Sequence, residues 1–308
     1  MGEDITQNIS TSVSKKFLDN FHLLHTDSTA NNSLKFYCPL VDANAFNYDG
    51  LIPALSEAAG HYCLSRRTWQ EYKDEPMRLS KLVRSKFRSL ATNEGELGEL
   101  MLFSFLETDL NAPKIATKME LKTNPNMYFN GADGVHYLKT SENTYQLIFG
   151  ESKVYTDMME GITAAISSIH KFKTETIKDD ETGELRGITF ERGLINAHLA
   201  QEAFSEEDRE FIKSLIYPKA SNPYFVDTAF AIFVLFNVTI PADKKKLPNA
   251  EFRTWLFESL KAVIVENVDK IYAKIAKKQL DGHPFYFYLV PFEELDSAKD
   301  EILKEALS

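Results

Sequence analysis

The sequence predicts an α/β protein with three layers, in which a mixed central sheet lies between two layers of helices. Beyond residue 91, apolar runs typical of strands alternate with helical patterns, as expected for a sheet covered on both faces. Three strand candidates also follow one another between residues 114 and 154, and strands joined by short turns pair antiparallel. Together these observations predict a sheet that combines parallel and antiparallel neighbours.

The first 90 residues are expected to form an N-terminal accessory region of strands and a basic amphipathic helix. Two apolar runs separated by a turn-rich link predict a pair of strands. Two helical patterns follow, and the second has its apolar residues on one arc at helical spacing. The elements expected in this region, 1–90, are strands at 17–25 and 34–42 and helices at 51–65 and 75–90.

Residues 91–308 are expected to form the main core. The most apolar β-like run, 226–240, predicts a buried central strand. A charged turn and two helical patterns predict a helical insertion at about 173–222. The other elements expected in the core are helices at 92–107, 157–172, 248–278 and 293–308, and strands at 114–122, 134–140, 144–154 and 283–292.

The composition excludes several classes of protein. Hydrophobic residues make up 44% and charged residues 26% of the 308 residues, which is ordinary for a globular protein. We expect no membrane-spanning helix, no signal peptide and no bound nucleotide, because the long apolar run, the basic N-terminal pattern and the P-loop motif are all missing. The presence of only two cysteines argues against a disulfide framework, and we expect a bacterial cytoplasmic location. The net charge of −10 argues against general affinity for nucleic acid, although a local basic groove is compatible with it.

Two acids and a lysine are the residues most suited to chemistry. Glu151 and Lys153 end an apolar strand, and their equal parity places them on one face. Asp133 begins the preceding hairpin strand, at the expected level of Glu151. Adjacent carboxylates need a cation, and hard oxygen ligands select Mg²⁺ or Mn²⁺. A lysine beside them can stabilise charge on a phosphoryl oxygen, so the pattern predicts phosphodiester hydrolysis; the alternative is a surface ion pair.

A second acid–lysine motif and a histidine are weaker candidates. Glu120 and Lys122 repeat the same spacing, with Asp109 as a possible partner, but Asp109 is expected in a loop that precedes a proline. His136 has the opposite parity to Asp133 along the hairpin strand, so we expect a core or sheet-face histidine rather than a catalytic one.

Basic residues on two predicted elements are candidates for contacts with nucleic-acid phosphates. The helix at 75–90 has five basic residues and no acidic one from residue 77 onward. Such a cluster is either the solvated face of an amphipathic helix or a stripe that displaces counterions from a polyanion. The candidates are Arg78, Lys81, Arg84 and Arg88 on this helix and Lys118 and Lys122 on the strand at 114–122.

The order of these motifs resembles the PD-(D/E)XK nuclease superfamily. A helical G-x-x-x-E, from Gly95 to Glu99, precedes Asp133 and the Glu151-Ser152-Lys153 motif. Ala132 stands where the superfamily name has proline. More narrowly, GELGEL, GADGVH and FGESK are similar to HamA, the family of nuclease subunits of the Hachiman bacterial antiphage systems, best over about residues 92–172.

The resemblance implies a restriction-endonuclease-like core at 91–308 and a Mg²⁺-dependent DNA endonuclease or nickase, with Mn²⁺ as a possible substitute. It also implies a partner helicase of superfamily 2, similar to HamB. Asp133 and Glu151 would bind the metal and Lys153 would act on the attacking water. A helix glutamate would complete the metal shell; Glu96 has a competing capping role, which favours Glu99 and leaves the choice open. The alternative is a DNA-sensing or adaptor subunit that has this fold, docks on the helicase and does not cleave DNA.

Overall fold

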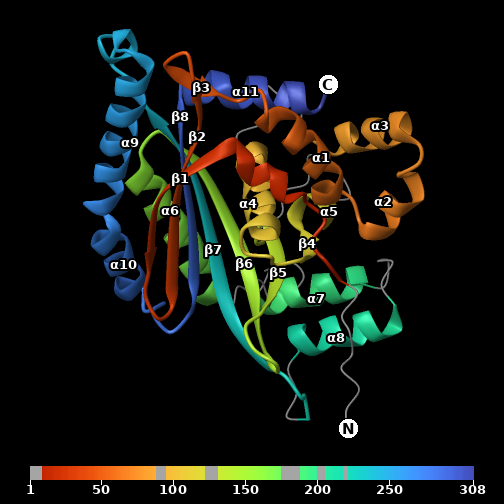
Figure 1. Ribbon diagram of the computed structural model, residues 1–308. Helices are drawn as coiled ribbons and strands as arrows, with labels where there is room; N and C mark the ends of the chain where they lie inside the picture. Colours follow the sequence, from red (N-terminus) through yellow and green to blue (C-terminus); the bar gives the residue numbers. More distant parts are fainter. Residues whose placement is uncertain (1–8, 88–94, 122–130, 175–187, 200–204, 218–220) are drawn as a thin grey trace, which may run out of the picture.

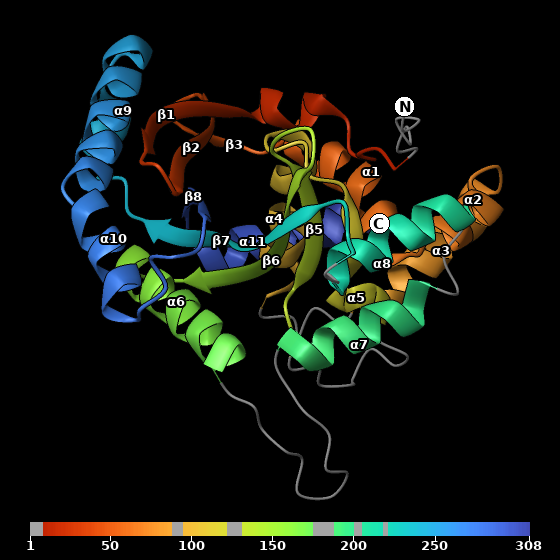
Figure 2. The same ribbon diagram turned by 90° about the horizontal axis from the view of Figure 1, so that it is seen from below.

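A mixed sheet forms the middle layer of the structure, and helices cover both of its faces (Figures 1 and 2). The computed structural model describes residues 9–87, 95–121, 131–174, 188–199, 205–217 and 221–308. The strand order is β1-β2-β8-β7-β6-β5-β4, and β3 pairs with β2 beside this path. The strands are β1 (Phe21–Ser28), β2 (Asn32–Asp42), β3 (Ala45–Asn47), β4 (Lys114–Thr117), β5 (Gly134–Lys139), β6 (Thr144–Tyr155), β7 (Phe225–Val238) and β8 (Phe285–Glu293).

The predicted α/β class with a mixed sheet is confirmed by the pairing of these strands. Strands β2, β8, β7 and β6 run parallel to one another, whereas β1 with β2, β6 with β5 and β5 with β4 are antiparallel. The hairpin of β5 and β6 has the expected register, with Gly134 opposite Gly150. This register brings the start of β5 to the level at which the Glu151 motif begins.

The two faces of the sheet carry separate helical layers. Helices α6, α9 and α10 cover one face, and α1, α4 and α11 cover the other (Figures 1 and 2). The helices are α1 (Leu51–Cys63), α2 (Arg66–Tyr72), α3 (Pro76–Lys86), α4 (Glu96–Thr108), α5 (Lys118–Leu121), α6 (Met158–Thr174), α7 (Ile188–Leu199), α8 (Glu206–Ile216), α9 (Asn249–Val265), α10 (Val268–Lys277) and α11 (Leu295–Ala306), with short 3₁₀ helices η1 (Lys15–Asn20) and η3 (Lys244–Lys246). None of the helices in the described ranges combines the length and the apolar composition needed to span a bilayer.

Strand β7 is the buried central strand that the sequence predicts. Residues 229–236 are all buried, because the strand has a helical layer on each face. Alternate side chains divide between the two cores: Phe230 and Ile232 face the core that includes α6, and Ala231 and Phe233 face the core that includes α4.

The N-terminal strands belong to the central sheet rather than to a separate accessory region. Strand β2 pairs in parallel with β8, so that Leu34 lies opposite Phe287. The boundary expected near residue 90 therefore does not separate two sheets. The reason is that residues 21–42 bury their apolar face in the same core as β8. The two segments are far apart in the chain: the Asn31 side chain donates a hydrogen bond to the carbonyl of Asp281, 250 positions later.

Two predicted elements end earlier than expected because side chains replace backbone hydrogen bonds. The strand expected at 114–122 stops at Thr117, whose hydroxyl accepts a hydrogen bond from the Glu120 N–H at 3.2 Å and starts the short helix α5. The helix expected at 248–278 is two helices, α9 and α10. Between them, the Asn267 side chain donates to the Val263 carbonyl at 2.8 Å, and such side-chain bonds compete with the helical pattern.

Helix α4 packs closely against β6, and two glycines make this possible. A Cβ on Gly98 would lie 3.0 Å from a methyl carbon of Val154, and a Cβ on Gly150 would lie 2.9 Å from a methyl carbon of Leu102. Side chains larger than hydrogen at these positions would push the helix away from the strand. The close approach explains why glycine interrupts the apolar run of β6, and it places Glu99 of α4 beside the end of that strand.

The carboxylate of Asp109 ties the C-terminal end of α4 to β2 and β8. It accepts hydrogen bonds from the Lys35 ammonium at 2.7 and 2.8 Å, from the Tyr37 hydroxyl at 2.7 Å and from the Tyr288 hydroxyl at 2.8 Å. Burial and the negative charge of Asp109 raise the pKa of both tyrosines, so both hydroxyls stay protonated and act as donors.

We expect Asp109→Asn to lower the free energy of unfolding by about 3 kcal/mol, because it leaves the partly buried Lys35 ammonium without its counter-charge. Urea unfolding of the full chain measures the change. Asp19→Asn, at an exposed position in η1, is the matched control and should alter stability by less than about 0.5 kcal/mol. Equal effects of the two substitutions would contradict the role given to Asp109.

Candidate functional site

Asp133 lies where β5 begins and β6 continues past it. The Asp133 N–H donates to the Gly150 carbonyl at 2.9 Å, which extends the hairpin pairing by one residue. Its carboxylate atom Oδ2 accepts hydrogen bonds from the Ser152 N–H at 2.8 Å and from the Ser152 hydroxyl at 2.9 Å. Asp133 therefore caps the backbone of β6 at the point where β6 loses its neighbour.

The second oxygen of Asp133 shares a lysine with a glutamate of α4. The Lys118 ammonium donates to Asp133 Oδ1 at 3.2 Å and to Glu99 Oε1 at 3.5 Å. The other oxygen of Glu99, Oε2, accepts a hydrogen bond from the Tyr62 hydroxyl at 2.6 Å. The two carboxylates are nearly inaccessible, whereas the Lys118 side chain keeps 21% of its surface exposed.

A buried ion pair fixes the position of Lys118 relative to α1. The Lys114 ammonium donates to Glu120 of α5 at 2.6 Å and to the carbonyls of His61 and Leu64 at 2.8 and 2.9 Å. A cation at the C-terminal end of α1 is favourable because the helix carbonyls there have no helical partners. The unit formed by α1, β4 and α5 thus holds the Lys118 side chain in place.

Glu151 and Lys153 extend from β6 on the opposite face from Ser152. The Lys153 ammonium donates to Glu151 Oε1 at 2.5 Å, and the Ser168 side chain of α6 also bonds to Glu151. Ser152, by contrast, lies against Gly98 of α4. Charged side chains therefore reach the end of β6 from both faces: Glu99 and Lys118 on the side of α4, and Glu151 and Lys153 on the side of α6. Asp133 lies at the edge of the strand between these two pairs.

These groups act on one another electrostatically despite their different faces. Burial, and after it the charge of Asp133, raise the pKa of Glu151 from 4.5 to about 7, against the opposing effect of Lys153. Burial lowers the pKa of Lys118, but the charges of Asp133, Glu99 and Glu151 outweigh it and leave that pKa above its ordinary value. Lys118 and Lys153 are therefore both charged at neutral pH.

The structure brings together the four residues predicted for catalysis, with two further residues that the sequence did not indicate for this role. Glu99 bonds to Lys118, which also bonds to Asp133, so Glu99 belongs to the cluster. Glu96 lies near the same groups, because its charge and that of Glu99 both raise the pKa of Tyr62. Tyr62 had no signal in the sequence, and Lys118 was expected on a strand.

The acids do not form a metal site as they are arranged. Across the described ranges, no group of three or more His, Cys, Asp or Glu side chains is placed so that it could hold a metal ion. The chemistry of three carboxylates suits Mg²⁺, but each carboxylate already bonds to an ammonium group: Asp133 and Glu99 to Lys118, and Glu151 to Lys153. The predicted metal ligands therefore lie close together, but the positive charge that balances them comes from lysines.

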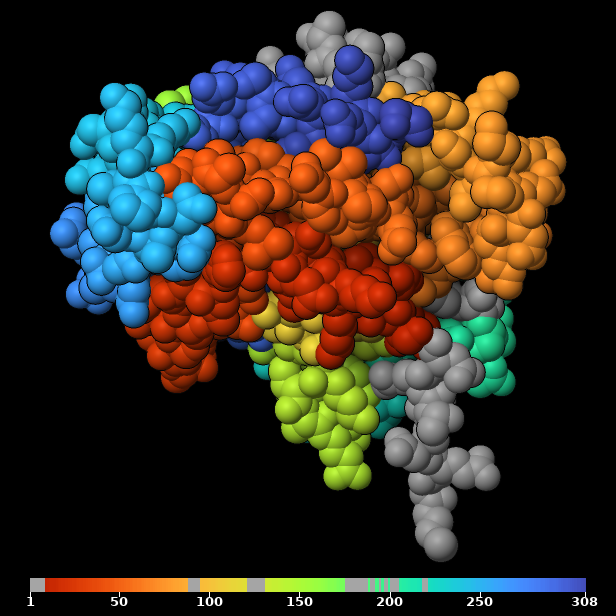
Figure 3. All heavy atoms as spheres, turned by 45° about the horizontal axis from the view of Figure 1, so that its top comes forward, coloured from red at the N-terminus to blue at the C-terminus, as the bar shows by residue number. Residues whose placement is uncertain are grey.

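The predicted nucleic-acid contacts have different outcomes. Lys118 bonds to Glu99 and Asp133 and is partly exposed, and its contact with nucleic acid stays a prediction; Lys122 and Arg88 lie outside the described residues. Arg78 bonds to Glu75 at 3.3 Å and lies over the Tyr72 ring at 4.6 Å. Lys81 and Arg84 are exposed on the lobe formed by α2 and α3, which projects at one corner of the surface in Figure 3.

The weaker candidates have structural roles. Glu120 pairs with Lys114, whereas Asp109 pairs with Lys35, so these two acids do not share a site. His136 is fully buried, its Nδ1 bonds to the Ala112 carbonyl at 2.8 Å, and burial lowers its pKa to about 4. It is therefore a neutral core histidine, as expected.

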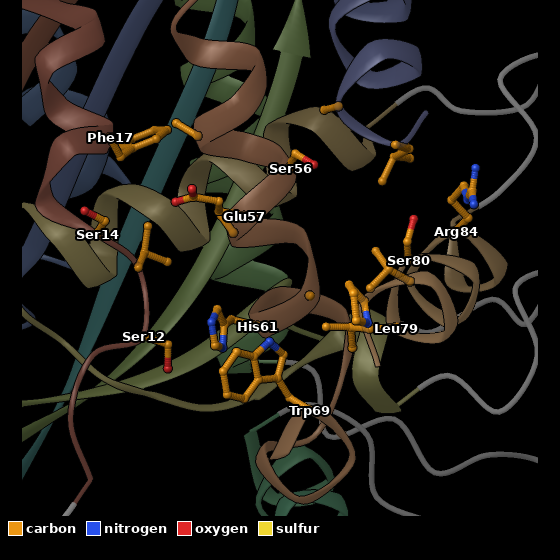
Figure 4. A pocket seen from close by; sticks show the side chains of 18 of the residues that line it. Ser12, Ser14, Phe17, Ser56, Glu57, His61, Trp69, Leu79, Ser80 and Arg84 are labelled. Atoms are coloured by element: carbon orange, nitrogen blue, oxygen red, sulfur yellow. The ribbon is translucent and has the colours of Figure 1, made fainter. Parts of the chain in front are cut away.

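A hollow of about 420 Å³ lies apart from the acids, between η1, α1, the lobe of α2 and α3, and the end of α11. Figure 4 shows the rings of His61 and Trp69 side by side in it, with Ser80 and Arg84 farther along its wall; the two ring centroids are 4.3 Å apart. The described residues that line this hollow do not include the acids or lysines at the end of β6, so it is not part of the candidate site.

Comparison with known proteins identifies a family. The model of the family described as HamA matches residues 15–306, which includes the acids, their lysines and both N-terminal strands. No curated protein matches the chain.

We expect the free energy of unfolding in EDTA to fall as the pH rises from about 5 to about 7.5. Between the ordinary pKa of Glu151 and its raised value of about 7, the folded state keeps a proton that the unfolded state has released. Urea unfolding across this range should show a smaller decline for Glu151→Gln, and an intermediate decline for Asp133→Asn, which removes one cause of the shift. Parallel curves for all three proteins would contradict an interaction between the two acids.

Proposed function

The chain belongs to the HamA family, and on that premise we propose that it is the DNA-cleaving subunit of a Hachiman antiphage system, hydrolysing phosphodiester bonds under the control of a partner helicase. Family membership supports the antiphage role itself. Cleavage, the helicase and the wider relationship to PD-(D/E)XK nucleases are parts of the proposal.

The observation that carries the proposal is the gathering of Glu99, Asp133, Glu151 and Lys153 at the end of one strand. Helix α4, the start of β5 and the end of β6 contribute to it, and the pKa of Glu151 is raised to about 7 by burial and by Asp133. Buried acids with shifted pKa values are costly to the fold, and they occur preferentially at functional sites. In this cluster three acids face two lysines.

The side chains have separate roles in this proposal. Asp133, Glu151 and Glu99 would supply carboxylate oxygens for Mg²⁺, or for Mn²⁺ in its place. Lys153 would stabilise negative charge near the scissile phosphate, because its ammonium stays protonated beside Glu151. Ser152 positions Asp133 through two hydrogen bonds.

The charge of the chain fits control by a partner. A net charge of −10 opposes binding to DNA over most of the surface, so only a restricted basic region such as Lys81 and Arg84 would contact phosphates. A helicase of superfamily 2, similar to HamB, would then bring DNA to the site.

A second candidate function is a DNA-sensing or adaptor subunit that does not cleave. The observation that favours it is the pairing of every acid in the cluster with an ammonium group, together with the lack of a metal-holding group among the described side chains. In this case the acids would stabilise the fold and the activity would reside in the partner.

Plasmid nicking distinguishes the two functions. We expect the chain, alone or with its helicase, to nick supercoiled plasmid with Mg²⁺ and not with EDTA. Glu151→Gln and Lys153→Met should each slow nicking by about 100-fold or more, because each removes a charge that acts on the reacting phosphate. Glu142→Gln, at an exposed position in the same hairpin, is the matched control and should cut normally. No nicking by the chain with its helicase and Mg²⁺, or antiphage protection that survives Glu151→Gln, would favour the adaptor. Equal loss of nicking in the control would contradict the assignment of cleavage to this cluster.

We also expect the double variant Lys81→Ala and Arg84→Ala to weaken DNA binding uniformly across sequences and to lower the slope of log affinity against log salt by about 1 to 2. Fluorescence anisotropy with a short duplex at several salt concentrations measures both effects. Lys261→Ala with Lys277→Ala removes two exposed charges from α9 and α10, on the opposite side of the sheet, and serves as the control. Equal losses in the two double variants would exclude a specific role for the α2 and α3 lobe.

A further inference from the structure

The hydrogen bonds of Asp133 and Glu99 divide their oxygens into two kinds. One oxygen of each acid is held by uncharged donors: Asp133 Oδ2 by Ser152, and Glu99 Oε2 by the Tyr62 hydroxyl. The other oxygen of each acid bonds to the Lys118 ammonium, at 3.2 and 3.5 Å. Two carboxylate oxygens from different elements therefore converge on one point, and that point is occupied by a positive charge.

A third acid acts on the same point. The charge of Glu151 is among the causes that raise the pKa of Lys118, although Glu151 bonds to Lys153 rather than to Lys118. All three predicted metal ligands therefore stabilise positive charge at the position of the Lys118 ammonium, whichever group supplies that charge.

We propose that Lys118 and a divalent cation compete for this position between Glu99 and Asp133. The inference rests on the proposed function, in that it assigns these acids to a divalent ion. It explains why the acids lie together and yet do not form a metal site. The ammonium bonds to Glu99 Oε1 and Asp133 Oδ1 at 3.5 and 3.2 Å, whereas Mg²⁺ requires oxygen ligands at about 2.0 to 2.1 Å.

The two cations exclude each other for electrostatic and steric reasons. An ammonium group within about 4 Å of a divalent ion is strongly repelled in a partly buried site. A metal ion bonded to Glu99 and Asp133 would also take the lone pairs that accept the hydrogen bonds of Lys118. The Lys118 side chain is 21% exposed, so it has a route to solvent, unlike the buried Lys114 at 4%. The resting subunit therefore has a lower metal affinity than its three acids would otherwise provide.

The test measures Mn²⁺ binding to the full chain without DNA, by isothermal titration calorimetry and by the EPR signal of free Mn²⁺. We expect Lys118→Met to bind Mn²⁺ at least tenfold more tightly than the wild type. Lys153→Met is the matched control, because it removes the same charge from the same cluster without emptying the position between Glu99 and Asp133. Its gain in affinity should be clearly smaller. Adding Glu99→Gln to Lys118→Met should abolish the gain.

Thermal unfolding gives a second readout that also reports whether the variants fold. Without metal, Lys118→Met should have a lower Tm than the wild type, because Glu99 and Asp133 lose their counter-ion; Mn²⁺ should then raise its Tm by more than it raises that of the wild type. Lys118→Gln, which can still donate hydrogen bonds to both acids, replaces Lys118→Met if the latter does not fold. Equal Mn²⁺ affinities for the wild type and the Lys118 variant, or an equal gain from Lys153→Met, would overturn the proposal.

The outcome is separable from that of the proposed function. A chain with the expected order of Mn²⁺ affinities that never nicks DNA, even with the helicase, keeps the competition between Lys118 and metal and loses the nuclease assignment. A chain that nicks DNA while Lys118→Met gains no affinity keeps the nuclease assignment and loses the competition.

Discussion

Three carboxylates gathered at the end of a buried strand must be matched by positive charge, and this requirement determines much of the surrounding structure. Lys118 forms ion pairs with both Asp133 and Glu99, and Lys153 forms one with Glu151. Removing either amine would leave an uncompensated buried charge, which typically lowers the free energy of unfolding by about 3 to 5 kcal/mol. The fold therefore has to bring a lysine to each side of β6, and both lysines are partly exposed, so that each can exchange its carboxylate for another partner.

The close packing of α4 on β6 is what places a helix acid beside this strand. Gly98 and Gly150 remove the side chains that would separate the two elements, and Gly150 also lies opposite Gly134 at the end of the hairpin pairing. The same glycines explain why an apolar strand passes directly into a charged motif. Gly150 allows α4 to approach the strand closely. Glu151 and Lys153, which follow it, lie in the part of β6 that no longer pairs with β5.

Elements with strong local patterns were predictable from the sequence, and contacts between distant segments were not. The alternation along β6 placed Glu151 and Lys153 on one face, and the apolar run of β7 predicted a central strand; both follow from side-chain periodicity. The pairing of β2 with β8 and the bond from Tyr62 to Glu99 join segments far apart in the chain, and periodicity holds no information about them. Lys118 was misplaced because a single hydroxyl, that of Thr117, turns the strand into a helix.

The unit that holds Lys118 is also in contact with the basic lobe formed by α2 and α3. Helix α1 carries Tyr62 on the side of the acids, and two residues earlier Gly60 packs against Trp69 and Val83 of α2 and α3. A ligand on the lobe and the carboxylate of Glu99 are thus connected through one helix. Contiguity alone is not coupling, because coupling requires an element with two arrangements whose balance both sites bias. The Lys118 side chain is such an element if a cation can replace it: one arrangement neutralises the acids from within, and the other leaves them to an ion from solution.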